Sequence, residues 1–114
     1  MSFKINNLVL SEVATPISDV FISKYMPEAN HTFSVIYIHT LSLCVKGNPP
    51  KNNLEISNSL NLLESDIIRA WQYWAKKGII NYDELNNIVE FIPLTQDDSV
   101  MIKSKSTPNL SPVL

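Results

Sequence analysis

The side chains that most often hold metal ions or act as nucleophiles are scarce in this sequence, which contains His31, His39 and one cysteine, Cys44. His39 and Cys44 are five residues apart, a spacing that turns two side chains of a helix away from each other and matches no zinc-binding pattern. Because Cys44 lies in an apolar stretch, we expect a buried and inert thiol. The chain has two glycines and no glycine-rich phosphate loop. We therefore expect no catalytic residue, no metal site, no cofactor and no enzymatic activity.

A second group of chemically capable side chains lies in residues 62–80, LLESDIIRAWQYWAKKGII. Ile67, Trp71 and Trp74 occur at positions i, i+4 and i+7, which predicts an amphipathic helix with both tryptophans on its buried face. Gly78 follows at the position that commonly ends a helix. The outer face would carry the candidate contacts to DNA or to a protein partner, which are Ser65, Arg69, Gln72, Tyr73 and Lys76. Among the aromatic residues of this helix, the one expected to be free for a partner is Tyr73, because it lies off the apolar stripe.

The charge around this helix is unfavourable for binding duplex DNA. Residues 79–100 contain five acidic residues and no Lys or Arg, and residues 50–78 contain four basic residues against three acidic ones. The formal net charge of the chain is −2. Because neutralisation of phosphates supplies most of the nonspecific affinity for DNA, we expect only weak or indirect DNA binding through this domain.

The elements expected before this helix begin with residues 7–12, NLVLSE, a short apolar run that predicts a strand. The next segment predicts a helix with Thr15 as its N-cap and Pro16 at its first position. A longer helix would then begin after Asn30, a good capping residue, and end at Gly47.

The helix between Asn30 and Gly47 is apolar on more than one face, which is more surface than a single neighbour covers. Together with the apolar strand it predicts a self-association surface, formed by Leu8, Val9, Leu10, Val35 and Ile38. The chain would then be a homo-oligomer, a dimer or larger. A central helix enclosed by its own domain is equally consistent with the pattern.

The remaining elements are a short helix, capped by Asn52 or Asn53 and closed by a left-handed turn at Asn61, and two strands at residues 79–82 and 88–92. The order is therefore strand, helix, helix, helix–turn–helix and hairpin. It predicts a mainly α fold with a small β-hairpin wing, a winged helix-turn-helix with an N-terminal strand/helix extension.

The length of 114 residues fits a single domain, which we assign to residues 1–93. Residues 94–114 lose periodicity and gather Ser, Thr and Pro, so we expect a flexible linker or tail. No apolar run approaches the roughly 18–20 residues of a membrane span, and no signal-peptide pattern opens the chain. With a single cysteine, a reducing, cytoplasmic location is expected.

Two segments of the chain, TPISDVFISKYMPEANHTFSVIYIHTLSLC and ISNSLNLLESDIIRAWQYWAKKGII, resemble the N-terminal domain of the DnaD-like replication-initiation proteins. The residues that match the opening motif are Thr15, Pro16, Ile17, Phe21, Ile22, Tyr25, Met26, Pro27 and Ala29. Those that match the second motif are Leu60, Glu64, Ser65, Asp66, Ile67, Ala70, Trp71, Tyr73, Trp74, Gly78, Ile79 and Ile80. The resemblance spans residues 8–93.

This resemblance implies a self-associating scaffold that assembles the bacterial primosome and contacts the replication initiator and other primosome proteins. It also implies that DNA binding belongs largely to a separate C-terminal domain. This chain would then be either an N-terminal fragment of a longer protein or a shortened relative, and the linker-like composition of residues 103–114 favours the fragment. The alternative is a winged-helix transcriptional regulator of phage or plasmid origin, which would place Arg69, Gln72 and Lys76 in the major groove of DNA.

Overall fold

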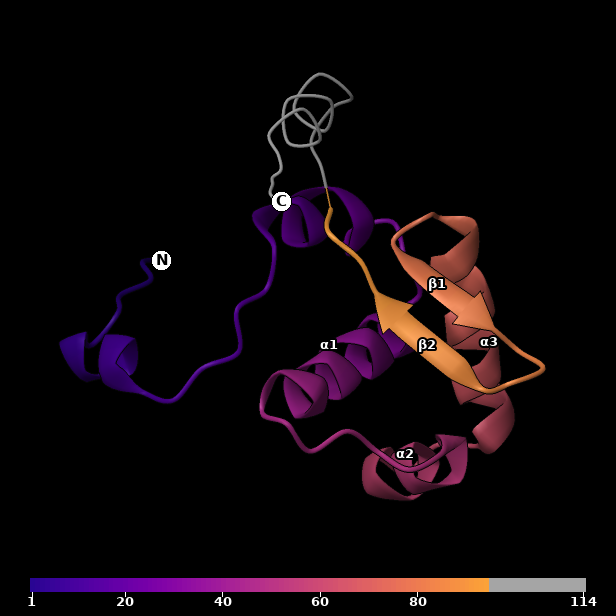
Figure 1. Ribbon diagram of the computed structural model, residues 1–114. Helices are drawn as coiled ribbons and strands as arrows, with labels where there is room; N and C mark the ends of the chain where they lie inside the picture. The colour runs from indigo at the N-terminus through magenta and orange to yellow at the C-terminus, as the bar shows by residue number, and fades with distance from the viewer. Residues whose placement is uncertain (95–114) are drawn as a thin grey trace, which may run out of the picture.

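The computed structural model describes residues 1–94, which form a mainly helical fold with one two-stranded antiparallel sheet (Figure 1). The elements are the 3-10 helix η1 (Asn7–Ser11), the π-helical turn η2 (Phe21–Tyr25), the helices α1 (His31–Val45), α2 (Asn53–Leu60) and α3 (Glu64–Lys76), and the strands β1 (Ile80–Asp83) and β2 (Ile88–Phe91). The prediction of a mainly α fold with a small hairpin is confirmed. No helix of residues 1–94 is long and apolar enough to cross a membrane.

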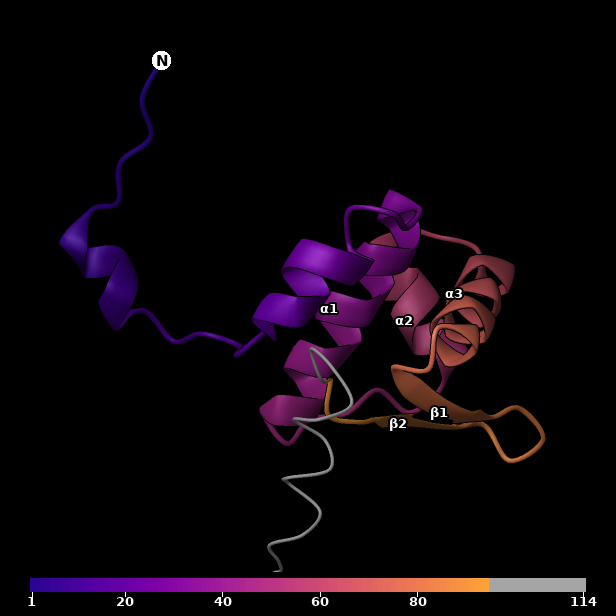
Figure 2. The same ribbon diagram turned by 90° about the horizontal axis from the view of Figure 1, so that it is seen from above.

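The helices pack around one core, and the hairpin covers one side of it. Helix α3 packs against α1, α2 and β1. Seen from above, the three α-helices form one layer and the hairpin lies along its edge (Figure 2). The strands pair with Ile80 opposite Phe91 and Asp83 opposite Ile88, which confirms the predicted hairpin to within one residue at its ends.

The predicted tail, residues 94–114, lies outside the described residues except for its first member. The side chain of that residue, Leu94, is partly buried against the core. The hairpin is thus followed by at least one residue that belongs to the packed part of the chain.

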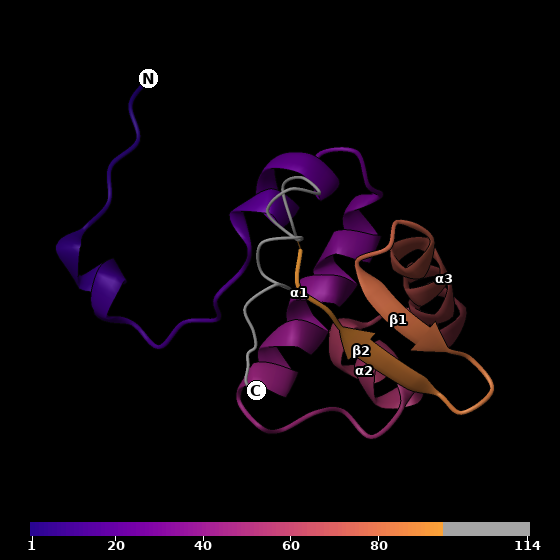
Figure 3. The ribbon, with the colours of Figure 1, turned by 45° about the horizontal axis from the view of Figure 1, so that its top comes forward.

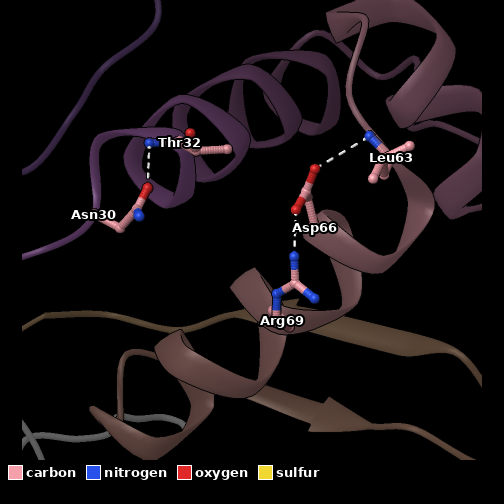
Figure 4. Close-up of polar contacts among 5 residues, drawn as sticks. All are labelled: Asn30, Thr32, Leu63, Asp66 and Arg69. Atoms are coloured by element: carbon pink, nitrogen blue, oxygen red, sulfur yellow. Dashed lines mark hydrogen bonds and ion pairs between the residues drawn. The ribbon is translucent and has the colours of Figure 1, made fainter.

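Local capping signals set the ends of the α-helices as predicted. The Oδ1 atom of Asn30 accepts a hydrogen bond of 2.8 Å from the N–H of Thr32 at the start of α1 (Figure 4). Asn52 caps α2 in the same way, accepting from the N–H of Glu55 at 2.9 Å. Asn61, with φ of 57°, adopts the left-handed conformation that ends α2. Gly78, with φ of 82°, ends α3, as expected for a residue without a Cβ atom.

Replacing the cap of α1 gives a first test of this local structure. We expect Asn30→Ala to lower the free energy of unfolding by about 1 kcal/mol, because the N–H of Thr32 loses its acceptor. Urea unfolding followed by circular dichroism measures the change. The control Asn48→Ala removes an exposed asparagine that makes no side-chain hydrogen bond within residues 1–94, and should change stability by less than about 0.5 kcal/mol. Equal effects of the two substitutions would contradict a capping role.

The core is built around the two tryptophans of α3. Trp71 and Trp74 are fully buried together with Ile67, which confirms the predicted inner face of this helix. Each indole N–H is satisfied: Trp71 donates to Oδ1 of Asn53 at 3.0 Å, and Trp74 donates to the carbonyl oxygen of Phe33 at 2.9 Å. These two bonds join α3 to α2 and α1, so they fix the position of α3 as well as filling the core.

The predicted strand at residues 7–12 is wrong, because these residues form the 3-10 helix η1. The side chain of Asn6 accepts a hydrogen bond of 2.8 Å from the N–H of Leu8, and the N–H of Val9 bonds to the carbonyl of Asn6. A strand needs a neighbour to pair its backbone groups, and the only sheet of the described chain consists of β1 and β2. Local capping therefore decides the conformation.

The predicted start of the next helix at Thr15 is also wrong. Helical structure begins at Asp19, just before η2, and the Oγ atom of Ser18 accepts a hydrogen bond of 3.1 Å from the N–H of Val20. The Thr15 hydroxyl instead donates to the Oγ atom of Ser42 in α1 at 2.7 Å. Thr15 is thus bonded to a distant residue outside any helix, and the side chain that accepts from the start of the helical segment is Ser18.

Candidate interaction surfaces

The outer face of α3 presents four of its five predicted contact residues to solvent. Ser65, Arg69, Gln72 and Lys76 are all exposed. Two of these donors already face carboxylates: Arg69 forms an ion pair with Asp66 (Figure 4), and Gln72 donates to Glu84 of the hairpin turn at 3.4 Å. A phosphate or a base edge would have to compete with these partners.

The fifth predicted residue, Tyr73, is half-buried and not the free aromatic that the sequence indicated. Its ring lies 5.3 Å from that of Phe33 and 4.9 Å from that of Trp74, measured between centroids. Although Tyr73 lies off the main apolar stripe of α3, Phe33 of α1 covers it. This aromatic residue therefore contributes to packing between two helices.

The hairpin beside α3 is negatively charged. Its described acidic residues are Asp83, Glu84 and Glu90, all exposed. The Asn86 side chain donates to the Asp83 carboxylate at 2.7 Å and its backbone N–H donates at 3.2 Å, which lowers the pKa of Asp83 below its ordinary value. The carboxylate next to the turn is therefore ionised at neutral pH. Such a surface repels a phosphate backbone and favours a neutral or basic partner.

The apolar residues of η1 are available for contact, although they do not form a strand. Leu8 and Leu10 are 74% and 79% exposed, and Val9 is about half exposed. Figures 1 and 3 show η1 on a segment that stands clear of the helices and the hairpin. The structure thus leaves three neighbouring large apolar side chains in water.

The two predicted surface residues of α1 lie in a different environment. Val35 is 49% exposed, whereas Ile38 is partly buried against the core. Since η1 lies away from α1 in all three ribbon views, the structure does not bring Leu8–Leu10 together with Val35 and Ile38. The proposed surface therefore divides into the exposed apolar residues of η1 and, apart from them, the single exposed side chain of Val35.

The prediction that Cys44 is buried is wrong, because Cys44 is exposed near the C-terminal end of α1. Partial desolvation raises the pKa of its thiol, which keeps the thiol protonated at neutral pH. Within residues 1–94, no three or more His, Cys, Asp or Glu side chains gather closely enough to hold a metal ion. The exposure arises because the buried stripe of α1 ends at Thr40, one turn earlier.

A groove beside β2 is a feature that sequence reasoning did not find. It has a volume of about 250 Å³ and lies between the C-terminal half of α1, residues 49–53, the start of α2 and β2. Its lining includes Thr40, Cys44, Ile56, Trp71, Val89 and Phe91. Thr40 is only 4% exposed, and its Oγ1 atom has no hydrogen-bond partner within residues 1–94. The sequence feature that indicates such a groove is the pair Pro49-Pro50. Neither residue has a backbone N–H with which to pair with a neighbouring strand.

No family model, curated protein or solved structure matches this chain. The surfaces described above are therefore the basis for assigning a function: the exposed η1, the carboxylate-paired outer face of α3, and the acidic hairpin.

Proposed function

We propose that this chain is a non-catalytic, self-associating scaffold that acts in bacterial replication initiation, like the DnaD-like proteins it resembles. The observation that carries the proposal is the exposed apolar surface of η1, where Leu8 and Leu10 make no contact with the core. Contiguous apolar side chains on a surface mark sites of association. Because every copy of the chain presents the same residues, a second copy is the natural partner, and closed symmetric pairing would cover them.

The core of this scaffold is a winged helix-turn-helix. The order α1, α2, α3, β1 and β2 supports this assignment, as does the tight turn at Asn61 that joins α2 to α3. The hairpin follows α3 after a single glycine-containing turn, in the place where a wing would lie. In this arrangement α3 occupies the position of a recognition helix, and η1 and η2 form the N-terminal extension.

The electrostatics of the outer face of α3 favour protein partners over duplex DNA. Arg69 is held by Asp66, and Gln72 faces Glu84, so the donors of a recognition helix are partly neutralised by carboxylates. The acidic hairpin carries the same sign of charge as the phosphate backbone of DNA and therefore repels it. The partners we infer are the replication initiator and other primosome proteins in the cytoplasm, with DNA contacted weakly or indirectly.

Substitution in η1 tests self-association directly. We expect Leu10→Asp to weaken the oligomer by about 1.5–3 kcal/mol, or about 10- to 150-fold in dissociation constant, because an apolar side chain leaves the contact. Sedimentation velocity over a range of concentrations measures this shift. The matched control Asn7→Asp places the same charge on an exposed polar position of η1 and should leave the oligomer unchanged. Identical behaviour of Leu10→Asp and the unmodified chain would exclude η1 as the contact.

A further inference from the structure

Both outer edges of the two-stranded hairpin lack a strand partner in the described chain, and the edge of β2 is the one that borders the groove. β2 pairs only with β1, so the backbone N–H and C=O groups on its other edge are available for a further strand. The groove described above lies along that edge, because residues of β2 line it and residues of β1 do not. The edge of β2 and the groove therefore form a single, continuous site.

Residues 49–53 lie across the groove from β2 but leave it unfilled. Pro49 and Pro50 have no N–H group, so they cannot complete a ladder of hydrogen bonds with β2. With a volume of about 250 Å³, the groove is smaller than the ~300–1,000 Å³ typical of drug-sized ligands. A few apolar side chains on an extended backbone fit this site better than a small molecule.

The first six residues of the chain, MSFKIN, have the pattern of such a strand. Apolar residues Met1, Phe3 and Ile5 alternate with polar ones, the period of a strand with one buried face. All three apolar side chains are exposed, and the segment has no regular structure in the described chain. The chain thus contains a strand-patterned segment without a sheet and a sheet edge without a strand.

We propose that residues 1–6 of a second copy add to the free edge of β2 and insert their apolar side chains into the groove. The faces match: Val89 and Phe91 of β2 are half-buried on the groove side, whereas Glu90 is exposed on the opposite side. The added strand would therefore place Phe3 in the groove and Lys4 on the side of Glu90, where opposite charges on neighbouring strands attract. This inference rests on the proposed self-association and assigns it a second contact besides η1.

A second copy is the occupant because the segment of the same chain leads away from the groove. Thr15 is bonded to Ser42 of α1 at 2.7 Å, and from there residues 1–14 extend away from the hairpin in all three ribbon views. Mutual exchange of these segments between two copies would form two equivalent contacts in a closed dimer. Each added contact strengthens the other, since the second forms within an existing complex.

Cys44 provides a built-in probe of this contact, because it lines the groove, is exposed and is the only cysteine of the chain. The experiment measures the rate at which Cys44 reacts with a thiol reagent over a range of chain concentrations. Since only chains with an open groove react, the rate should fall about tenfold when about nine chains in ten are paired. Phe3→Asn should restore the rate of the unpaired chain. The control Ser2→Asn places the same residue on the opposite face of the strand and should keep the protection.

Each other outcome overturns the proposal in a distinguishable way. Protection that is equal at all concentrations in a chain that sediments as a monomer would show that the chain's own N-terminal segment occupies the groove. Rates that stay high while sedimentation shows a larger species would place self-association elsewhere and leave the proposed function intact. Protection that survives Phe3→Asn would remove the strand from the groove, and a monomer at every concentration would contradict the proposed function as well.

Discussion

Trp74→Ala is expected to lower the free energy of unfolding by about 3–5 kcal/mol, close to the whole stability of a small domain, which is about 5–15 kcal/mol. Trp74 is fully buried, and its ring lies 5.3 Å from that of Phe21 and 5.4 Å from that of Tyr37. Truncation would leave a cavity where η2, α1 and α3 meet. It would also leave the carbonyl oxygen of Phe33 without its donor at 2.9 Å.

Urea unfolding followed by circular dichroism measures this effect. Trp74→Phe separates the two contributions, because it keeps most of the ring and removes the N–H donor, so its cost should be clearly smaller than that of Trp74→Ala. Lys76→Ala, on the exposed side of the same helix, should change stability by less than about 0.5 kcal/mol. If Trp74→Ala cost no more than the exposed substitution, the core would be wrongly assigned.

Duplex DNA should bind this chain no more tightly than roughly 10⁻⁴ M, the weak end of nonspecific affinity. The acidic hairpin repels phosphates, and Arg69 and Gln72 already face Asp66 and Glu84. Fluorescence anisotropy of labelled duplexes at low salt measures the affinity under the conditions most favourable to binding. A single-stranded oligonucleotide of the same length is the control for nonspecific charge effects.

Tight binding that depends on the duplex sequence would favour the transcriptional regulator instead. In that case Arg69→Ala should weaken binding by about 1–3 kcal/mol, the contribution of a bidentate contact to a base. The matched control is Lys51→Ala, which also removes one exposed positive charge but lies outside α3. A larger effect at Arg69 than at Lys51 would then identify α3 as a reading helix.

Features that depend on neighbouring residues were predictable from the sequence. The caps Asn30 and Asn52, the left-handed Asn61 and the terminal Gly78 each act through bonds or dihedral angles within a few residues. The inner face of α3 was predictable for the same reason, because helical periodicity places its tryptophans on one side. These elements are found where local preference and tertiary packing agree.

Features that depend on distant partners were not predictable. Residues 7–12 have strand composition but no strand to pair with, and Asn6 stabilises a helical turn instead. Thr15 is a good N-cap by type, yet helical structure begins only at Asp19 and the Thr15 hydroxyl bonds to Ser42 of α1. Tyr73 was expected to be free, but Phe33, distant in the sequence, covers its ring. In each case the deciding contact comes from a residue whose position the local pattern does not specify.

The candidate surfaces likewise divide into those set by neighbouring residues, which were predictable, and those set by distant residues, which were not. The sequence identified Ser65, Arg69, Gln72 and Lys76 as exposed because they lie opposite the apolar stripe of one helix. The groove was missed because its lining comes from α1, α2, α3 and β2 together, with residues 49–53. Only the fold brings Thr40, Trp71 and Val89 to one place.

The most direct test of the central claim, self-association, is the molar mass of the unmodified chain by sedimentation equilibrium at increasing concentration. The proposed scaffold predicts a mass that rises above the 12.9 kDa of one chain towards a whole-number multiple of it. A mass of one chain at every concentration would contradict the proposal, because the apolar side chains of η1 would then remain in water without a partner.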